Sequence, residues 1–390
     1  MCGLKSIGSF MKRVGIITAT AVGLMFLAPA GADLASASGT HQITLMPNGS
    51  TSSTKVIKTS AHSYKLPKVS FSRPGYSFVG WAKTLRGPKV YSDRATVRFT
   101  SSIKLYAIWK EVLPTAPNVV GHTVGSLLWH EEFRGASGSA IDSNSWTARY
   151  CGLEASNGGG TCHNNEPQWY LPSAVALDGT SAGNAVITTK RVYSAPVGGI
   201  CKAWSGCQFT SARFDTQGKV AFKYGYIEAR IKMPAGGRNW PAFWALGDSM
   251  NDVGWPRAGE IDIAEQGGNL PMRNSAAVHF SVTEFGGGHR YIWGEELNQA
   301  NYQTGFHTYG LAWLPGRLEF YVDRELFWTA TPTNVQGYWP FDKPFFLIFN
   351  NAVQGSAGFG GNYSGWAESQ TVIDYVHAWQ LNGQGSVVKK

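Results

Sequence analysis

From Leu127 to about Asn382 the chain is a succession of short runs in which apolar and polar side chains alternate, separated by glycine-rich segments. In residues 226–233 and 318–323 the alternation has a period of two, which places one face of a strand in a core and the other outside it. No stretch shows a sustained helical period, and no repeat of propeller length stands out. This region therefore predicts an all-β fold, either a β-sandwich or a jelly roll.

The composition agrees with a strand-rich globular protein. Glycine accounts for 47 of the 390 residues, aromatic residues for 13% and charged residues for 15%. Disordered chains need high charge and low hydrophobicity, and coiled coils need many charged helix-forming residues, so both classes are excluded. Abundant glycine and aromatic residues favour strands joined by tight turns.

The net charge of +9 is distributed unevenly. Residues 33–112 contain 12 Lys and Arg but three Asp and Glu, whereas residues 113–390 contain 19 against 22. A basic segment of this kind is suited to contact an anionic wall polymer or a membrane surface, or it serves as a spacer. The larger part has no basic bias, so we expect no nucleic-acid partner.

Residues 1–32 have the pattern of a signal peptide. Three basic residues precede an apolar run over 14–28, and Ala30-Gly31-Ala32 fits an A-x-A cleavage site. A membrane anchor is the alternative, but this run is too short to span about 30 Å as a helix. We therefore expect a secreted protein, extracellular or associated with the cell surface, with no transmembrane segment in the mature chain.

Four cysteines remain after the signal peptide, and in an exported protein they favour two disulfides. Three pairings are possible. The pairs Cys151–Cys162 and Cys201–Cys207 are preferred because each closes a short, glycine-containing loop. A zinc site is the alternative, but the spacing lacks the C-x-x-C pairs that are usual for structural zinc.

Residues 41–111 contain several short β-like runs and predict a small β-rich module. This segment resembles the internalin B-type bacterial surface repeat through Gly75-Tyr76, Gly80-Trp81 and the closing segment 105–109. The resemblance implies a module of surface and secreted proteins, with possible contact to a cell wall. Trp81 and Trp109 are interpreted as core residues rather than as sugar platforms. Residues 112–126 contain two prolines and no periodicity, which predicts a linker.

Three acids lie within six residues of one another in the segment 255–268, "WPRAGEIDIAEQGG": Glu260, Asp262 and Glu265. Ile261 and Ile263 alternate with the first two acids, which predicts a strand with one apolar and one acidic face. Neighbouring carboxylates raise one another's pKa and cost free energy, so this pattern indicates a functional cluster. A solvated edge strand that carries acids by chance is the alternative.

Strict alternation would send Glu265 to the opposite face from Glu260. A one-residue bulge near Ile263–Ala264 would return it to the same face. The two backbones would then lie on the order of 13 Å apart, at about 3.3 Å per residue. Inward-leaning side chains could reduce the carboxyl separation to about 5–5.5 Å, the value expected of a retaining glycosidase.

The segment "GEIDIAE" resembles the E-x-D-x-x-E signature of glycoside hydrolase family 16, and in particular its laminarinase-like members. Further matching segments cover nearly all of residues 127–382: 127–135, 164–170, 224–247, 306–323 and 344–355. The resemblance implies a β-jelly-roll with a glycan cleft and retaining hydrolysis of β-glucans. By the same resemblance Glu260 is the nucleophile, Asp262 its assistant and Glu265 the general acid/base.

The resemblance also implies residues that contact the sugar. Trp240 and Trp244 match cleft aromatics of the family, although core packing is the alternative for each. Weaker candidates for hydroxyl contacts or stacking are Asn165, Arg213, Trp255 and His279, and His279 is alternatively a buried structural histidine. After "NNAVQG" the chain departs from the family pattern, with Phe359 in place of a usual tryptophan, so the subsite preference stays open.

Family members often carry a calcium ion away from the catalytic centre. The residues that match those ligands are Glu132, the carbonyl group of Gly179, and Asp374, and oxygen ligands of this kind suit calcium. Ordinary surface acids are the alternative. No cofactor is expected for catalysis.

These observations favour a monomeric, secreted endo-β-1,3-glucanase with β-glucan as its partner. The same fold acting on mixed-linkage β-glucan or on a galactan is the first alternative. A non-catalytic glycan-binding protein is the second, and the presence of all three acids argues against it.

Overall fold

A computed structural model describes residues 39–150, 166–193, 208–297, 301–354 and 361–390. The predicted signal peptide and all four cysteines of the mature chain lie outside the described residues. The described part is nearly all β-structure, which confirms the predicted fold class. No helix among the described residues has both the length and the apolar character needed to cross a membrane.

The small N-terminal module contains one four-stranded sheet and one strand pair. The sheet has the order β2-β1-β6-β4, in which β1 and β6 run parallel, and β3 pairs with β5. Trp81 is fully buried in a core that belongs to this module alone, as predicted. The bounds are β1 His41–Met46, β2 Lys55–Thr59, β3 Ser63–Lys65, β4 Tyr76–Ala82, β5 Thr96–Arg98 and β6 Ile103–Glu111.

The large domain is a sandwich of two sheets. The first, here called the back sheet, has the order β22-β21-β20-β15-β24-β11-β12-β9, with β10 on β11 and β7 on β24. Its bounds are β7 Val124–Glu131, β9 Gln168–Tyr170, β10 Val175–Leu177, β11 Ala185–Arg191, β12 Phe209–Ser211, β15 Gly225–Lys232, β20 His307–Leu314, β21 Arg317–Val322, β22 Glu325–Ala330 and β24 Glu368–Leu381.

The second sheet, here called the front sheet, has the order β19-β18-β17-β16-β23-β13-β8, with β14 pairing β23 and β25. Its bounds are β8 Thr147–Ala148, β13 Arg213–Asp215, β14 Val220–Lys223, β16 Asn239–Gly247, β17 Glu260–Glu265, β18 Arg273–Thr283, β19 Gly286–Leu297, β23 Phe345–Val353 and β25 Ser386–Lys389. The helices of the described ranges are single turns: η2 Pro172–Ala174, α1 Met250–Val253 and α2 Pro332–Val335.

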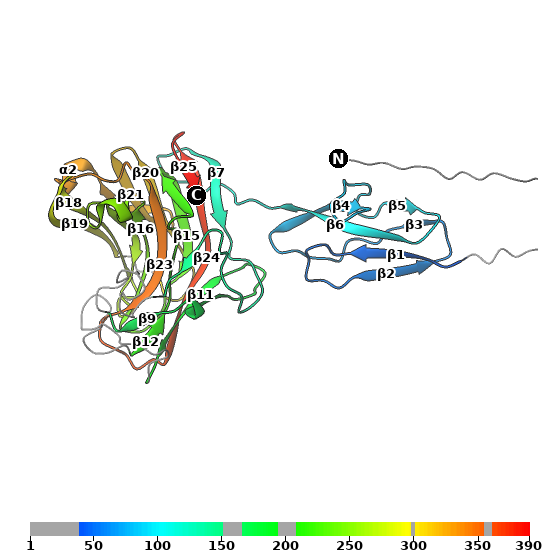
Figure 1. The fold of residues 1–390 in the computed structure, drawn as a ribbon, viewed down its shortest axis with the longest axis horizontal. Helices are drawn as coiled ribbons and strands as arrows, with labels where there is room; N and C mark the ends of the chain where they lie inside the picture. Colours follow the sequence, from blue (N-terminus) through cyan, green and yellow to red (C-terminus); the bar gives the residue numbers. More distant parts are fainter. Residues whose placement is uncertain (1–38, 151–165, 194–207, 298–300, 355–360) are drawn as a thin grey trace, which may run out of the picture.

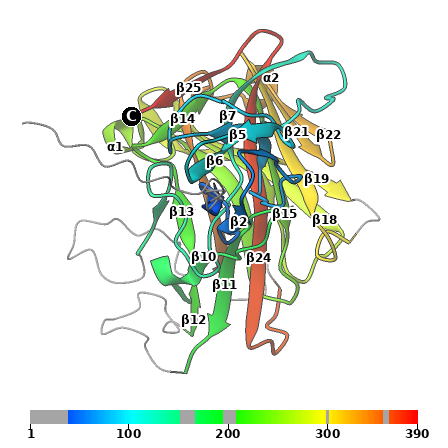
Figure 2. The same cartoon turned by 90° about the vertical axis from the view of Figure 1, so that its right-hand side faces the viewer.

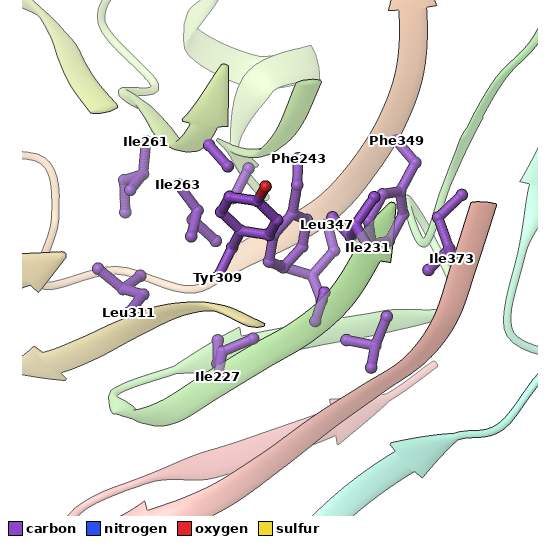
Figure 3. Packing of buried hydrophobic residues seen from close by; sticks show 14 of the residues in the cluster. Ile227, Ile231, Phe243, Ile261, Ile263, Tyr309, Leu311, Leu347, Phe349 and Ile373 are labelled. Atoms are coloured by element: carbon purple, nitrogen blue, oxygen red, sulfur yellow. The ribbon is translucent and has the colours of Figure 1, made fainter. Parts of the chain in front are cut away.

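The main core fills the space between the two sheets, where the apolar faces of the alternating strands meet (Figure 3). Ile227 of β15 and Leu311 of β20 face Phe243 of β16 and Phe349 of β23. The Phe243 and Phe349 rings stack with centroids 4.6 Å apart. Because alternate residues of the front sheet are fixed in this core, the intervening residues must point outward.

The end of the predicted linker packs on the outer face of the back sheet. Val119 is 1% exposed against Tyr226 and Trp379, and His122 Nε2 lies 2.6 Å from Glu319 Oε2. β7 begins at Val124, three residues before the predicted start of the domain, and β25 lies beyond its predicted end. The small module lies to one side of the sandwich (Figure 1), and β24 and β15 lie behind it in the perpendicular view (Figure 2).

Candidate active site

The three acids lie on β17, in the middle of the front sheet. Ile261, Ile263 and Ala264 of the same strand are fully buried in the main core. Burial of these apolar side chains fixes the strand against the back sheet. The acids are thereby held on a rigid element rather than on a loop.

A β-bulge interrupts the pairing of β17 with both of its neighbours. Phe243 pairs with Ala264 but Trp244 pairs with Asp262, and on the other side the register shifts between Asp262 and Glu265. Ile263 and Ala264 therefore both enter the core, and the alternation restarts at Glu265. This is the bulge that the spacing of the acids predicts, and it brings Glu265 to the face of Glu260.

Two tryptophans and a histidine hold the acids. Trp255 Nε1 donates to Glu260 Oε2 at 2.8 Å, and Trp240 Nε1 donates to Glu265 Oε1 at 2.9 Å. His279 on β18 lies opposite Glu260 in register, and its Nε2 is 3.1 Å from Asp262 Oδ2 and 3.8 Å from Glu260 Oε1. Each carboxyl group is thus oriented by a neighbouring ring N–H or ring nitrogen.

Burial raises the pKa of all three acids, and the charge of a neighbouring carboxylate raises it further for Glu260 and Asp262. Burial, followed by the charge of Asp262, raises the pKa of Glu260 to about 8, while His279 and the Trp255 N–H act in the opposite direction. Burial, followed by the charge of Glu265, raises the pKa of Asp262 well above its usual range. Burial also raises the pKa of Glu265. The cluster therefore retains protons near neutral pH, and a general acid is available there.

Polar and aromatic side chains from other strands complete this face. Trp244 Nε1 donates to Asn350 Oδ1 at 2.7 Å, and Asn350 Nδ2 donates to the Tyr170 hydroxyl at 3.2 Å. The Arg213 guanidinium lies 4.8 Å from the centre of the Trp244 ring, and burial lowers its pKa. Trp244 is therefore fixed next to Asp262, its register partner.

Glu260 and Glu265 share one face of the sheet, and the pKa of each is raised. Glycoside hydrolases use two such carboxyl groups, one as the general acid and the other as the nucleophile or base. A model described as glycosyl hydrolases family 16 matches residues 175–377 of this chain. The chain belongs to glycosyl hydrolase family 16. A second model, the Listeria-Bacteroides repeat domain, matches residues 41–108 and agrees with the predicted surface repeat.

Curated relatives and solved structures of family 16 agree with this assignment. A glucan endo-1,3-beta-glucosidase of Cryptopygus antarcticus is 32% identical over 67% of this chain and 94% of its own length. A beta-glucanase of Rhodothermus marinus is 34% identical over 50% of this chain and 72% of its own. The structure of an endo-beta-1,3-glucanase from Pyrococcus furiosus superposes with a TM-score of 0.57 at 30% identity, covering 71% of this chain and all of that one.

The structure brings most of the predicted site residues of this family 16 chain together. The acids, three tryptophans and His279 share one face, as described above, and Arg213 packs on Trp244. Asn165 and Phe359 lie outside the described residues. Sequence reasoning missed Asn350 and Tyr170, which contact each other although they lie far apart in the chain. It also missed His289 and Tyr291, although "GHRYIW" alternates as a strand would.

The residues predicted to bind calcium lie away from the acids. His377 Nε2 is 2.8 Å and His130 Nδ1 is 3.3 Å from Glu132 Oε1, and Arg230 donates to Asp374. Burial opposes ionisation of Glu132, but hydrogen bonds from the two histidines outweigh it and lower the pKa of Glu132 to about 2. Basic side chains hold both carboxylates as arranged, and they would have to move before a calcium ion could take these oxygens as ligands. Calcium binding stays a prediction that titration with calcium would test.

Proposed function

We propose that this family 16 enzyme is an endo-acting, retaining hydrolase of β-1,3-glucan. The observation that carries the proposal is the bulged strand with Glu260 and Glu265 on one face, each held by a tryptophan N–H. The named relatives with β-1,3-glucanase activity support the choice of linkage. Exposed indole faces in the site suit a neutral sugar chain, because flat aromatic rings cover its C–H faces.

The first step takes place in the fraction of the enzyme in which Glu260 is ionised, a fraction that grows as the pH rises towards 8. The Glu260 carboxylate attacks the anomeric carbon and forms a glycosyl ester. The bond to the leaving oxygen breaks, and that oxygen takes the proton of Glu265. The Trp255 N–H favours the ionised form of Glu260, since it donates to that carboxylate. Asp262, between the two, shares a proton with the cluster and so limits the repulsion on Glu260.

In the second step, Glu265 accepts a proton from water, and the water oxygen attacks the anomeric carbon. The ester bond breaks and Glu260 leaves as a carboxylate. Esterification of Glu260 removes one negative charge from the cluster. The pKa of Glu265 then falls, which suits its change of role from acid to base.

Replacement of Glu260 tests the assignment directly. Glu260→Gln keeps the shape of the side chain but removes the nucleophile, so we expect laminarin hydrolysis to fall by roughly 10³-fold or more in a reducing-sugar assay. Glu325→Gln, on the exposed edge of the back sheet, is the matched control and should retain wild-type activity. Wild-type turnover in Glu260→Gln, with an unchanged melting curve, would refute the mechanism.

Stereochemistry separates retention from inversion. Proton NMR of freshly cleaved laminarin should show the β-anomer of the new reducing end before mutarotation. An initial α-anomer would mean that water attacks directly, and the nucleophilic role of Glu260 would be lost.

The finer choice of substrate follows from product analysis. We infer β-1,3-glucan first, mixed-linkage β-glucan second and a galactan third, because residues 113–390 carry no basic excess that would favour a sulfated galactan. Incubation with each polymer and sizing of the products would rank them. A protein that binds laminarin without releasing reducing ends would instead be a glycan-binding protein.

We also propose that the enzyme is secreted as a monomer with two disulfides and that its basic small module contacts an anionic wall polymer. The signal-peptide pattern and the excess of Lys and Arg over residues 33–112 support this proposal. Retention of the full chain on cell-wall preparations should fall as salt rises, because screening weakens exposed charge contacts. Salt-insensitive retention would contradict an electrostatic contact.

A further inference from the structure

Two half-exposed aromatic side chains on β19, two strands away from the acids, have no part in the mechanism above. Tyr291 is 56% exposed and Trp293 is 53% exposed. Ile292, between them, packs against the main core. The alternation of the strand therefore turns both aromatic rings to the outer face of the front sheet.

The register places these rings in line with the catalytic acids. Glu260 pairs with His279, which pairs with Tyr291, so the three residues lie side by side across β17, β18 and β19. Asp262, Ala277 and Trp293 form the next row in the same way. At about 4.8 Å between strands, the β19 backbone lies about 10 Å from that of β17.

A continuous set of stacked rings joins Tyr291 to the site. The Tyr291 ring stacks on His279 with centroids 5.4 Å apart and on His289 with centroids 5.7 Å apart, each at 17°. The Trp255 ring, whose N–H is bonded to Glu260, lies 4.4 Å from His289. This packing fixes the plane of Tyr291, so little side-chain entropy is left to lose when a ligand stacks on it.

Aromatic rings lie on both sides of the acids along one row. Trp244 pairs with Asp262 on one side, and Trp293 follows beyond Ala277 on the other. Ala277 is small, so it forms a low floor between the acid and Trp293. A polymer that crosses the strands over the acids would meet an indole at each end of this row.

We propose that Tyr291 and Trp293 form a second sugar platform, which holds a β-glucan chain a few units from the bond that is cleaved. The occupant is the substrate polymer because the row is continuous with the catalytic acids and presents flat apolar faces. Glu295, which follows the two rings on the same side of β19, is paired with Arg273. This inference rests on the proposed function and adds the residues that select long chains.

Chain-length kinetics on the full-length enzyme test the platform. The variants are Trp293→Ala, Tyr291→Ala and the conservative Trp293→Phe. The control is Phe285→Ala, which removes an 82% exposed ring from the turn of the same strand pair. The substrates are laminarin and laminari-oligosaccharides of increasing length, and kcat and KM are measured for each.

For Trp293→Ala we expect kcat/KM on laminarin to fall by about tenfold, mainly through KM, because one stacked ring is lost. The shortest oligosaccharide that is cleaved should be turned over as by the wild type. Trp293→Phe should recover most of the loss, and Phe285→Ala should resemble the wild type. An equal loss on every chain length, no loss, or the same loss in Phe285→Ala would overturn the platform.

A binding measurement keeps the platform separate from the proposed reaction. Affinity electrophoresis in gels that contain laminarin reports binding of Glu260→Gln without turnover. Retardation that disappears in Glu260→Gln/Trp293→Ala would support the platform even if the wild type failed to hydrolyse laminarin. Retardation that is unchanged in the double variant would refute it even if the wild type is active.

Discussion

At the residue scale, the site depends on how three acids share charge in a small buried volume. Glu260 and Glu265 are each held by a single indole N–H, and His279 is the nearest basic ring to Asp262. Burial raises the pKa of each acid, while the charge of His279 lowers the pKa of Glu260 and of Glu265. The pH range of activity therefore depends on His279, although His279 takes no direct part in the proposed reaction.

Replacement of His279 should shift the pH profile to higher pH. His279→Asn removes the ring whose electrostatic interaction lowers the pKa of Glu260, so the ascending limb of kcat/KM should move to higher pH. The descending limb, set by protonated Glu265, should move in the same direction. His289→Asn is the control, because His289 touches His279 but not an acid, and its profile should move less. A shift to lower pH would contradict this electrostatic role.

The raised pKa of Glu260 also makes the site a source of instability at high pH. The folded-state pKa of about 8 exceeds the ordinary value of 4.5, so the folded protein holds the proton more tightly than the unfolded chain does. This contribution to stability is complete below about pH 4.5 and is lost as the pH rises through 8. Glu260→Gln, which has no such proton to lose, should melt about 2–5 °C above the wild type at pH 9.

Near pH 4.5 the two proteins should melt at similar temperatures. Thermal unfolding over a pH series checks this prediction. Glu132→Gln is the opposite control, because the pKa of Glu132 is lowered to about 2 and its contribution is lost on acidification. A constant difference between Glu260→Gln and the wild type at every pH would argue against the linkage.

At the element scale, β17 depends on the turn that leads into it. Gly259 has a φ of +85°, and a Cβ there would lie 2.6 Å from Pro340 Cγ and 2.9 Å from Phe345 Cζ. Gly254, in the preceding turn, has a φ of +71° and nothing within 4 Å of such a Cβ. Both glycines have a positive φ, but they differ in their surroundings.

Alanine at these two positions separates strain from collision. Gly254→Ala should cost about 1–3 kcal/mol of unfolding free energy from backbone strain alone, because its φ of 71° with a ψ of 170° is a conformation that essentially only glycine adopts. Gly259→Ala should cost about 1–3 kcal/mol more, since it also overpacks the region below β17. Urea denaturation measures both. Equal losses of unfolding free energy in the two variants would mean that Pro340 and Phe345 can move aside at little cost.

The acid spacing was sufficient to predict the bulge in β17, because only an extra residue returns Glu265 to the face of Glu260. The strand pattern likewise predicted the all-β sandwich. The partners of the acids from other strands were not predictable in the same way. Tyr291 reaches His279 only through the register of β18 and β19, and Asn350 reaches Tyr170 through contacts far apart in sequence. Such pairs depend on strand order, which a single sequence with local patterns does not determine.

At the scale of the whole molecule, the linker is part of the large domain. Val119 fills a position between Tyr226 and Trp379, and Asn382 accepts from the amide of Thr123 at 2.8 Å. The two prolines and the absence of periodicity predicted a linker, and a single buried valine does not show in such a pattern. The linker that follows the small module is therefore fixed to the large domain at Val119 and Thr123.

Substitution at neighbouring valines tests this docking. Val119→Ser removes a side chain that is 1% exposed and should cost about 1–3 kcal/mol of the stability of the large domain. Val120→Ser changes a side chain that is 71% exposed and should have little effect. Calorimetry of the full chain distinguishes the two. Identical melting of both variants would show that the segment does not hold the sandwich.

The position of Val119 also determines which side of the sandwich is next to the linker. The tether leaves from the back sheet, whereas the carboxyl groups open from the opposite side of the sandwich. A polymer bound to the small module would therefore lie on the side of the back sheet, and the catalytic acids would face away from it. Glucan in the surrounding medium would then reach the active site without competition from the polymer to which the small module is bound.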